Sequence, residues 1–351
     1  MIYTLTLNPA VDRELQVPEI RFGEVLRAHA HRVDWGGKGF NVSRALRVLG
    51  EDSVALGLVG GFAGQMIAAG LRQLGIAVDF VEIAGETRTN VVVIDGERHL
   101  KVNEAGPEIR PEDEALLLDK IRTLARAGDW WVLSGSLPPG ASPEVYAEVI
   151  RIVTSAGGRA VLDTSGPALA HGVAARPFLV KPNASEAAEL TGRPVHNLAS
   201  ARVAAREILV RGAQHVVISL GARGALLWDG AAAWAARPPR LVERNPVGAG
   251  DSMVGGLVQG LAHGLSLARA LRRAVACGAA AASRDGTGFD SRVQVAELEL
   301  DVDLIEIDPE PTPADPGEMP APGSDGVPED APEDANEAAT AAYGAATEGA
   351  R

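Results

Sequence analysis

Residues 36–41, GGKGFN, contain the residue types that hold a phosphate group. They stand directly before a helical pattern. Glycines at a helix start let backbone N–H groups approach an anion, and Lys38 adds a positive charge. The alternative is a glycine-rich loop that only begins a helix. The lysine inside the motif and Asn41 at its end favour phosphate binding over that alternative.

Residues 248–251, GAGD, form a second segment of this kind, again before a helical pattern. Successive N–H groups at a helix N-terminus make a preorganised site for the negative charge that develops on a transferring phosphoryl group. Asp251 would stand at the mouth of that site as a general base. An aspartate that merely caps a helix is the alternative, and so short a motif also occurs by chance in a glycine-rich chain.

Four more segments of polar and glycine residues each follow an apolar run. These segments are residues 134–140 (SGSLPPG), 163–166 (DTSG), 181–186 (KPNASE) and 219–224 (SLGARG). Ligand loops of open α/β sheets follow strands in this way, although any one of the four could be an ordinary turn. Their repetition in one chain favours a ligand site. None of them is a P-loop or a dinucleotide fingerprint, which argues against a dinucleotide enzyme.

Short apolar runs alternate with helical patterns from the N-terminus to near residue 285. Buried strands are predicted at residues 2–7, 54–60, 130–134, 159–163, 177–180 and 215–219. Helices are predicted at residues 40–49, 63–74, 111–127, 142–156, 184–191, 199–211, 249–263 and 266–284. This alternation indicates an α/β fold with a doubly wound, mostly parallel sheet flanked by helices.

Residues 13–35 and 89–102 break this rhythm, because they partly alternate polar and apolar residues with no helix between. Asp95-Gly96 in the second stretch is a hairpin turn signal. Two interpretations are open, namely a small sheet that stands off the main body as a lid, or edge strands of the main sheet. We assign both stretches to one folded domain that spans residues 1–307.

The formal net charge of −13 is concentrated in residues 308–351, which hold eleven acidic residues, one arginine and eight of the 22 prolines. This tail has almost no large apolar residue, so it is predicted to be disordered. Residues 1–307 carry a net charge of only −3 and have no basic stripe. Nucleic acid is therefore not an expected partner.

The chain is expected to act in the cytoplasm. Its N-terminal sequence, MIYTLTLNPAVDRE, lacks a basic leader, and no apolar run is long enough to span a membrane. The single cysteine, Cys277, fits a reducing compartment and is expected to be buried rather than nucleophilic. The seven histidines are scattered, so no metal-binding or acid–base role is assigned to them.

Taken in order, these segments resemble the ribokinase-like, or phosphofructokinase B, family of sugar kinases, from Met1 to about residue 290. The resemblance is closest to the hexose-phosphate branch, and within it to 1-phosphofructokinases. It rests on residues 6–12 (TLNPAVD), 36–41, 87–90 (TRTN), 101–104 (KVNE), 134–140, 181–183 and 247–253 (VGAGDSM). Ala105 departs from the family pattern, where proline is expected. The resemblance implies a ribokinase-like fold with a small β-sheet lid.

The resemblance also implies roles for individual residues. Asp251 would take the proton from the attacking sugar hydroxyl, and the amides of Gly248, Ala249 and Gly250 would stabilise the transition state. The residues implied in binding the sugar and its existing phosphate are Asp12, Gly37, Lys38, Asn41, Arg88, Lys101 and Ser136. The residues implied in binding ATP are Asn183, Glu186, Ser219, Gly221, Gly224 and Gly278. Glu186 is also linked, indirectly, to Mg²⁺.

The implied reaction is ATP-dependent phosphorylation of a ketohexose phosphate, first of all D-fructose 1-phosphate to fructose 1,6-bisphosphate. The residue chemistry agrees, because Lys38, Arg88 and Lys101 are cations able to neutralise a phosphorylated acceptor. Tagatose-6-phosphate kinase and 6-phosphofructokinase remain alternatives. Fructose 1-phosphate and fructose 6-phosphate place the phosphate and the accepting hydroxyl at opposite ends of a nearly symmetric ring, so one site could serve either. A non-catalytic sugar-phosphate sensor is the alternative from another class.

The expected partners are therefore small molecules. ATP and a sugar phosphate would bind with Mg²⁺, whereas membrane and nucleic acid are not expected. A nucleoside kinase would need a base-stacking pocket, and only 4% of the residues are aromatic. The resemblance leaves open a homodimer formed through the lid.

Overall fold

The computed structural model describes residues 1–96 and 98–307. The acidic tail, for which the composition predicts disorder, lies outside the described residues, so the domain boundary at residue 307 stays a prediction. Within the described part, no helix is long and apolar enough to cross a membrane.

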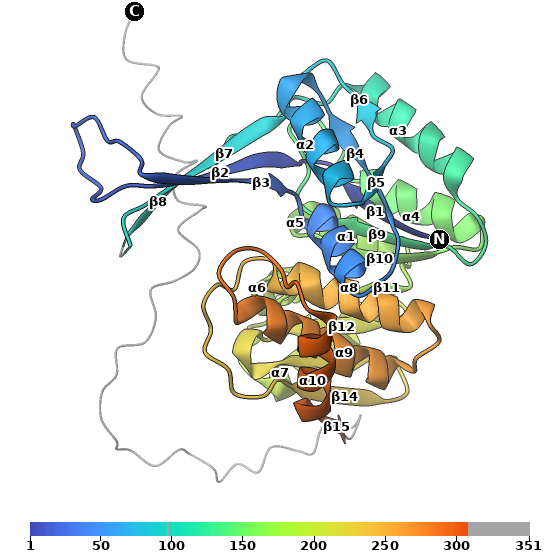
Figure 1. The fold of residues 1–351 in the computed structure, drawn as a ribbon. Coiled ribbons are helices and arrows are strands. Elements are labelled where there is room, and N and C mark those ends of the chain that lie inside the picture. The colour runs from blue at the N-terminus through green and yellow to red at the C-terminus, as the bar shows by residue number, and fades with distance from the viewer. Residues whose placement is uncertain (97, 308–351) are drawn as a thin grey trace, which may run out of the picture. The chain divides into compact units, whose positions relative to one another are not determined.

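A mixed sheet forms the centre of the main body (Figure 1). Its strands are β1 Ile2–Thr6, β4 Val54–Val59, β5 Ala77–Val78, β6 Val81–Glu82, β9 Trp130–Ser134, β10 Arg159–Asp163, β11 Leu179–Val180, β12 Val216–Ser219, β13 Ala225–Trp228, β14 Ala233–Arg237 and β15 Asp303–Ile307. Their order is β15-β14-β13-β12-β11-β10-β9-β1-β4-β5, with β6 also paired to β4. Within that spatial order, neighbouring strands from β12 across the sheet to β5 pair in parallel. β6 also pairs in parallel with β4. β13, β14 and β15 are antiparallel.

Helices cover both faces of this sheet. One core contains residues of α3 Pro111–Leu124, α4 Val145–Ser155, α5 Gly166–Ala174, α6 Ala184–Thr191 and α7 Leu198–Val210. The opposite core contains residues of α1 Lys38–Val48, α8 Ala249–Ala262, α9 Leu267–Ala282 and α10 Arg292–Asp301. Strand β9 shows the two-residue period, because Trp131 and Leu133 enter the first core while Trp130 and Val132 enter the second. α2 Gly61–Gln73 packs into a third, smaller cluster.

A separate sheet of four strands of the described chain projects from the main body (Figure 1). Its strands are β2 Ala10–Gln16, β3 Ala30–Gly36, β7 Arg88–Ile94 and β8 His99–Val102, in the order β3-β2-β7-β8. β2 pairs in parallel with β7 and in antiparallel with β3, and β7 and β8 form a hairpin. A small sheet, rather than edge strands of the main sheet, is therefore the correct interpretation of these stretches.

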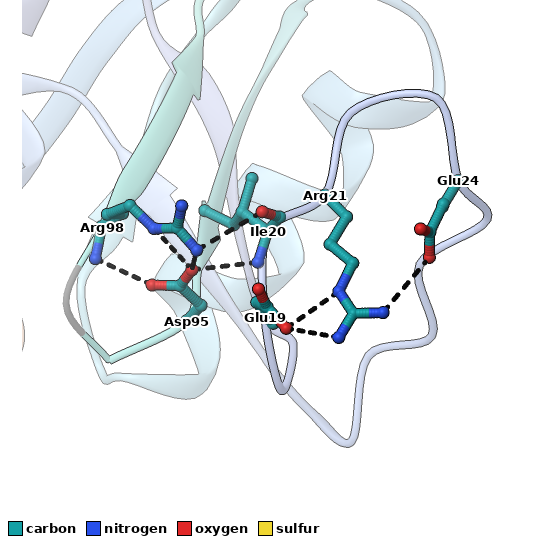
Figure 2. Close-up of polar contacts among 6 residues, drawn as sticks. All are labelled: Glu19, Ile20, Arg21, Glu24, Asp95 and Arg98. Carbon is teal, nitrogen blue, oxygen red and sulfur yellow. Dashed lines mark hydrogen bonds and ion pairs between the residues drawn. The ribbon is translucent and has the colours of Figure 1, made fainter.

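The carboxylate of Asp95 ties the loop between β2 and β3 to the turn between β7 and β8 (Figure 2). It accepts hydrogen bonds from Ile20 N at 2.9 Å and from Arg98 N at 2.8 Å, and it pairs with the Arg98 guanidinium at 2.7 Å. The Asp95 side chain is only 4% exposed. The ion pair between Glu19 and Arg21 on the same loop is exposed. A buried carboxylate with several donors holds a loop more firmly than an exposed pair does.

The strands and helices agree closely with the sequence predictions, apart from a few elements. The predicted helices correspond to α1–α4 and α6–α9, and the predicted strands to β1, β4 and β9–β12. Helix α5 was not predicted, because Gly166, Pro167 and Gly172 give it a low helix propensity. It forms because Leu169 and Val173 are buried in the core. Helix α10, the two-residue strands β5 and β6, and strands β13–β15 were also not predicted.

Candidate active site

Two helices begin at the same place in the structure. The first turns of α1 and α8 are joined by a hydrogen bond of 2.8 Å from Asn41 Nδ2 to Asp251 Oδ2. Each helix has a glycine at its N-cap, Gly37 or Gly248, and no side chain at that position caps its first amides. α6, α7, α9 and α10 are capped by an asparagine or serine, whereas α2, α4 and α5 also lack a side-chain cap. What sets α1 and α8 apart is that their uncapped N-termini meet at one point, an arrangement suited to an anion.

The amides in the first turn of α8 differ in availability. Ala249 N already donates to Pro246 O at 3.1 Å. Within the described residues, no group accepts from the N–H of Gly250 or Asp251. A Cβ on Gly250 would lie 3.6 Å from Lys181 Nζ, so this ammonium stands beside the free amides. The N–H of Gly248 likewise has no acceptor among the described residues, so Gly248, Gly250 and Asp251, unlike Ala249, have amides free to meet an anion.

A row of alternating charges lies next to these amides. Lys38 Nζ is 3.7 Å from Asp163 Oδ1 and 3.9 Å from Glu186 Oε1. Lys181 Nζ is 3.4 Å from the same Asp163 oxygen, and both side chains of this second pair are buried. Neither Asp163 nor Lys181 had an individual role predicted from the sequence. The available signal was their position, since Asp163 ends β10 and Lys181 directly follows β11.

The pKa values in this cluster follow from burial and from these charges. Burial raises the pKa of Asp251 to about 6, Asp163 adds to the rise, and Lys38 limits it. Burial would also raise the pKa of Asp163, but Lys181 and Lys38 outweigh it and hold that pKa below its usual value. Burial, with help from Asp163, raises the pKa of Glu186. Asp251 is thus ionised at neutral pH and close enough to its pKa to accept a proton efficiently.

Asp12 lies on the small sheet and faces polar residues on both neighbouring strands. Its Oδ1 accepts a hydrogen bond of 2.8 Å from Asn90 Nδ2, and Asp34 is its direct partner on β3. Burial raises the pKa of Asp12 despite the hydrogen bond from Asn90. Gly36 has no room for a side chain, because a Cβ there would lie 2.0 Å from Asp12 Oδ2. This glycine therefore lets the carboxylate approach the start of α1.

Arg88, the first residue of β7, joins the small sheet to two loops. Its Nη2 donates to Asn8 O at 2.9 Å and its Nη1 donates to Glu104 O at 3.0 Å. These two carbonyls hold the guanidinium in place without neutralising its charge. Lys101 on β8 is exposed, and the sheet register puts it on the same face as Asn90. The structure thus fixes Arg88 more firmly than Lys101.

Most residues predicted to bind ATP lie at or just after the ends of β11 and β12, whereas Gly278 lies within α9. Asn183 and Glu186 form a reciprocal capping box on α6, with both hydrogen bonds at 2.8 Å. Ser219 pairs with Asn183 through an isolated parallel bridge. The second Glu186 oxygen remains directed at Lys38, so the capping box positions that carboxylate toward the charged cluster.

Close packing or backbone conformation explains why three of the positions predicted to bind ATP are glycines. Gly221 and Gly224 have φ values of 60° and 91° in the turn after β12. A Cβ on Gly224 would lie 1.9 Å from Ala236 O, and one on Gly278 would lie 3.3 Å from Ala249 O. Gly278 thus allows α9 to lie against the first turn of α8. Ser136 is exposed two residues after the end of β9, and a Cβ on the preceding Gly135 would lie 3.9 Å from Lys38 Cβ.

The carboxylates beside Lys38 do not make a complete metal site by themselves. The described residues contain no group of three or more His, Cys, Asp or Glu that could hold a metal ion. Asp163 and Glu186 flank Lys38, and Asp163 Oδ1 accepts no hydrogen bond from the described residues. Mg²⁺ usually takes one or two protein carboxylates and completes its coordination with water and substrate phosphates. This pair fits a magnesium ion that arrives with a nucleotide.

Comparison with known proteins agrees with this geometry. The profile of the pfkB family carbohydrate kinases matches residues 4–294. The chain belongs to this family. This sugar kinase has the mixed α/β fold and the separate small sheet that the resemblance implied, and both predictions are confirmed.

Relatives and solved structures extend the match over most of the chain. The 1-phosphofructokinase of Bacillus subtilis (strain 168) is 37% identical over 302 residues, covering 86% of this pfkB kinase and 99% of the relative. The 1-phosphofructokinase of Escherichia coli (strain K12) is 38% identical over 309 residues, covering 86% and 97%. Phosphofructokinase-2 from Escherichia coli in complex with potassium matches at 34% identity and a TM-score of 0.81, covering 85% and 98%. A tetrameric inhibited form of that enzyme matches at 33% identity and a TM-score of 0.80, with the same coverage.

Proposed function

We propose that this pfkB kinase transfers the γ-phosphoryl group of ATP to a hydroxyl of a ketohexose phosphate, converting D-fructose 1-phosphate to fructose 1,6-bisphosphate. The observation that carries the proposal is the buried Asp251 carboxylate at the uncapped start of α8, held by Asn41 at 2.8 Å. A base, a set of free amides and two lysines are the parts that phosphoryl transfer requires, because its catalysis is chiefly positioning and electrostatics.

Asp251 would act as the general base. Its carboxylate accepts the proton of the acceptor hydroxyl while the hydroxyl oxygen forms a bond to the γ-phosphorus and the bond between that phosphorus and the leaving ADP oxygen breaks. The amides of Gly250 and Asp251, together with Lys38 and Lys181, stabilise the negative charge of the transferring group. When bound, Mg²⁺ would neutralise charge on the nucleotide phosphates, with Asp163 and Glu186 as its nearest carboxylates.

The acceptor would lie between these groups and the small sheet. Asp12 and Asn90 offer a carboxylate and an amide to sugar hydroxyls. Arg88, Lys101 and Ser136 are the proposed ligands of the phosphate that the acceptor already carries, since a guanidinium and an ammonium neutralise it. The choice of fructose 1-phosphate rests on the names of the relatives and on the sequence motifs. Tagatose 6-phosphate and fructose 6-phosphate are the alternatives.

Turnover assays with Mg-ATP test the proposal. The purified chain is given fructose 1-phosphate, fructose 6-phosphate, tagatose 6-phosphate and fructose, and ADP release and product identity are measured. We expect the highest kcat/KM with fructose 1-phosphate. A preference for either 6-phosphate would overturn the substrate and leave the sugar-phosphate kinase intact. Tight binding of a sugar phosphate with no ADP release for any sugar would instead favour a non-catalytic sensor.

The small sheet is also the proposed contact between two copies of the chain. One of its faces carries apolar residues, and Leu100 and Val102 on β8 are 41% and 55% exposed. On the neighbouring loop, Phe22 and Val25 are 86% and 83% exposed. A second copy would cover this apolar surface. Sedimentation should show a dimer that Val102→Asp weakens, whereas Asp at Val210, 83% exposed on α7, should leave it intact.

A further inference from the structure

The carbonyl of Gly135, directly after β9, is held by two buried hydroxyl groups. Tyr146 Oη donates to it at 3.1 Å and Thr164 Oγ1 donates to it at 2.8 Å. The two hydroxyl-bearing residues are 0% and 1% exposed. The N–H of the same glycine donates to Asp163 O at 2.9 Å. Both polar groups of Gly135 are therefore fixed, and its φ of +105° is one that glycine adopts without strain.

This arrangement sets the direction of the next amide. A trans peptide is planar, so the N–H of Ser136 points opposite to the carbonyl of Gly135, away from the two buried hydroxyls. Ser136 is exposed, and no acceptor for its N–H lies among the described residues. A Cβ on Gly135 would lie 3.9 Å from Lys38 Cβ. The amide of Ser136 is thus a free donor beside the lysine of the GGKGFN segment.

Two donors on one carbonyl fix its orientation. A buried hydroxyl must find a partner, and Tyr146 and Thr164 both find it in the same oxygen. That oxygen has two lone pairs and is then fully engaged. The peptide plane can no longer rotate without breaking two buried hydrogen bonds. Such fixation has a use where the amide on the other side must meet a ligand in one orientation.

We propose that Tyr146 and Thr164 are positioning residues that aim the Ser136 N–H at the phosphate already present on the acceptor sugar. The inference rests on the proposed function for the chemistry of the ligand, a phosphate monoester. Neither side chain touches the substrate. Together they would keep a main-chain donor in place, so that one phosphate would meet a fixed amide from the main body and, through Arg88, a cation from the small sheet.

The test compares Tyr146→Phe, Thr164→Val and the double variant with wild type. Each single variant should raise the KM for fructose 1-phosphate about 3- to 10-fold, the effect of one neutral hydrogen bond, and the double variant should raise it further. The KM for ATP, and kcat/KM for unphosphorylated fructose, should stay within about twofold of wild type. Thr164→Ser, which keeps the hydroxyl, should restore the KM.

Thr191→Val is the matched control, because Thr191 is also buried and donates to a backbone carbonyl, Ala187 O, at 2.8 Å. It should lower Tm without changing the KM for any sugar. An equal loss with fructose and with its phosphate, or a loss of Tm alone as in the control, would overturn the positioning role. If wild type prefers another ketohexose phosphate, the substrate named above fails and the same KM comparison is made with that sugar.

Amide NMR of the labelled protein gives a readout that does not depend on turnover. Titration with fructose 1-phosphate, or with inorganic phosphate, should shift the Ser136 amide proton downfield in wild type and much less in the double variant. An unshifted Ser136 amide in wild type with both anions would overturn the inference, even if the protein proved to be an active kinase.

Discussion

The two halves of the site are built in opposite ways. In the main body, the Asp163 and Lys181 side chains are 2% and 4% exposed and lie between helices packed on both faces of a sheet. In the small sheet, every residue of β7 is only partly buried and every residue of β8 is exposed. Elements with few buried contacts open at lower free energy than core elements. The comparison suggests a rigid half for phosphoryl transfer and a more mobile half for acceptor recognition.

The largest effect is expected from the rigid half. Asp251→Asn should lower kcat about 10²- to 10⁴-fold, the usual range for a lost general base, with little change in sugar-phosphate affinity. Steady-state kinetics and calorimetry measure the two quantities. Asp129→Asn is the matched control, because Asp129 is equally buried, at 7%, but binds the N-terminal amine at 3.1 Å. It should reduce stability and spare kcat. An Asp251→Asn variant with a tenth of wild-type turnover would remove Asp251 from the base role.

Arg88→Ala tests the half on the small sheet. Loss of a charge-assisted hydrogen bond to the substrate phosphate should lower kcat/KM for fructose 1-phosphate about 10- to 150-fold. Unphosphorylated fructose should be a poor substrate of both proteins and nearly indifferent to the change. Arg13→Ala, an exposed arginine on the same sheet, serves as the control and should change neither value. An equal fall for fructose and its phosphate would place Arg88 outside the phosphate site.

The pH dependence follows from the buried base. Because the pKa of Asp251 is about 6, kcat/KM should fall about tenfold per pH unit below that value and level off above it. The folded-state pKa lies above the ordinary value of 3.8, so the folded protein binds the extra proton and stability falls as pH rises from about 4 to about 6. Asp251→Asn should therefore be more stable than wild type at pH 7, by about 1–3 kcal/mol. Denaturant unfolding at pH 4 and pH 7 measures the difference. A loss of stability at pH 7 would contradict the raised pKa.

The smallest effect concerns the loop of the small sheet in Figure 2. Asp95→Ala leaves the backbone amides of Ile20 and Arg98 without their acceptor, which should lower the local opening free energy by about 1–3 kcal/mol. Hydrogen exchange of the Ile20 amide should become about 5- to 150-fold faster, with kcat unchanged. Glu19→Ala breaks only an exposed pair and should leave that exchange rate unaltered. Equal protection in both variants would show that the loop is held by its apolar contacts instead.

Local patterns were sufficient for most elements of the main body. Continuous apolar runs and helical periods locate β1, β4, β9–β12 and eight helices, because burial on both faces of a parallel sheet leaves a strong local signal. The alternation at residues 13–35 and 89–102 allowed either a lid or edge strands. The choice depended on pairing between β2 and β7, whose residues are far apart in the chain. The antiparallel strands β13–β15 were not predicted, and β14 (AWAAR) and β15 (DLIEI) lack the continuous branched apolar runs of the buried parallel strands.

The residues proposed to bind an anion were visible as sequence motifs, but their arrangement in space was not. Asn41 and Asp251 are 210 residues apart, and they meet because α1 lies against α8, where a Cβ on Gly255 would be 2.7 Å from Ala45 Cβ. The local turn at residues 246–249 engages the Ala249 amide and leaves that of Gly250 free, which residue types alone did not indicate. Residue type and spacing specify which groups can bind phosphate. The tertiary structure decides which of those groups are unpaired and how far their pKa values move. The reason is that burial and the charges of distant segments act only in the folded chain.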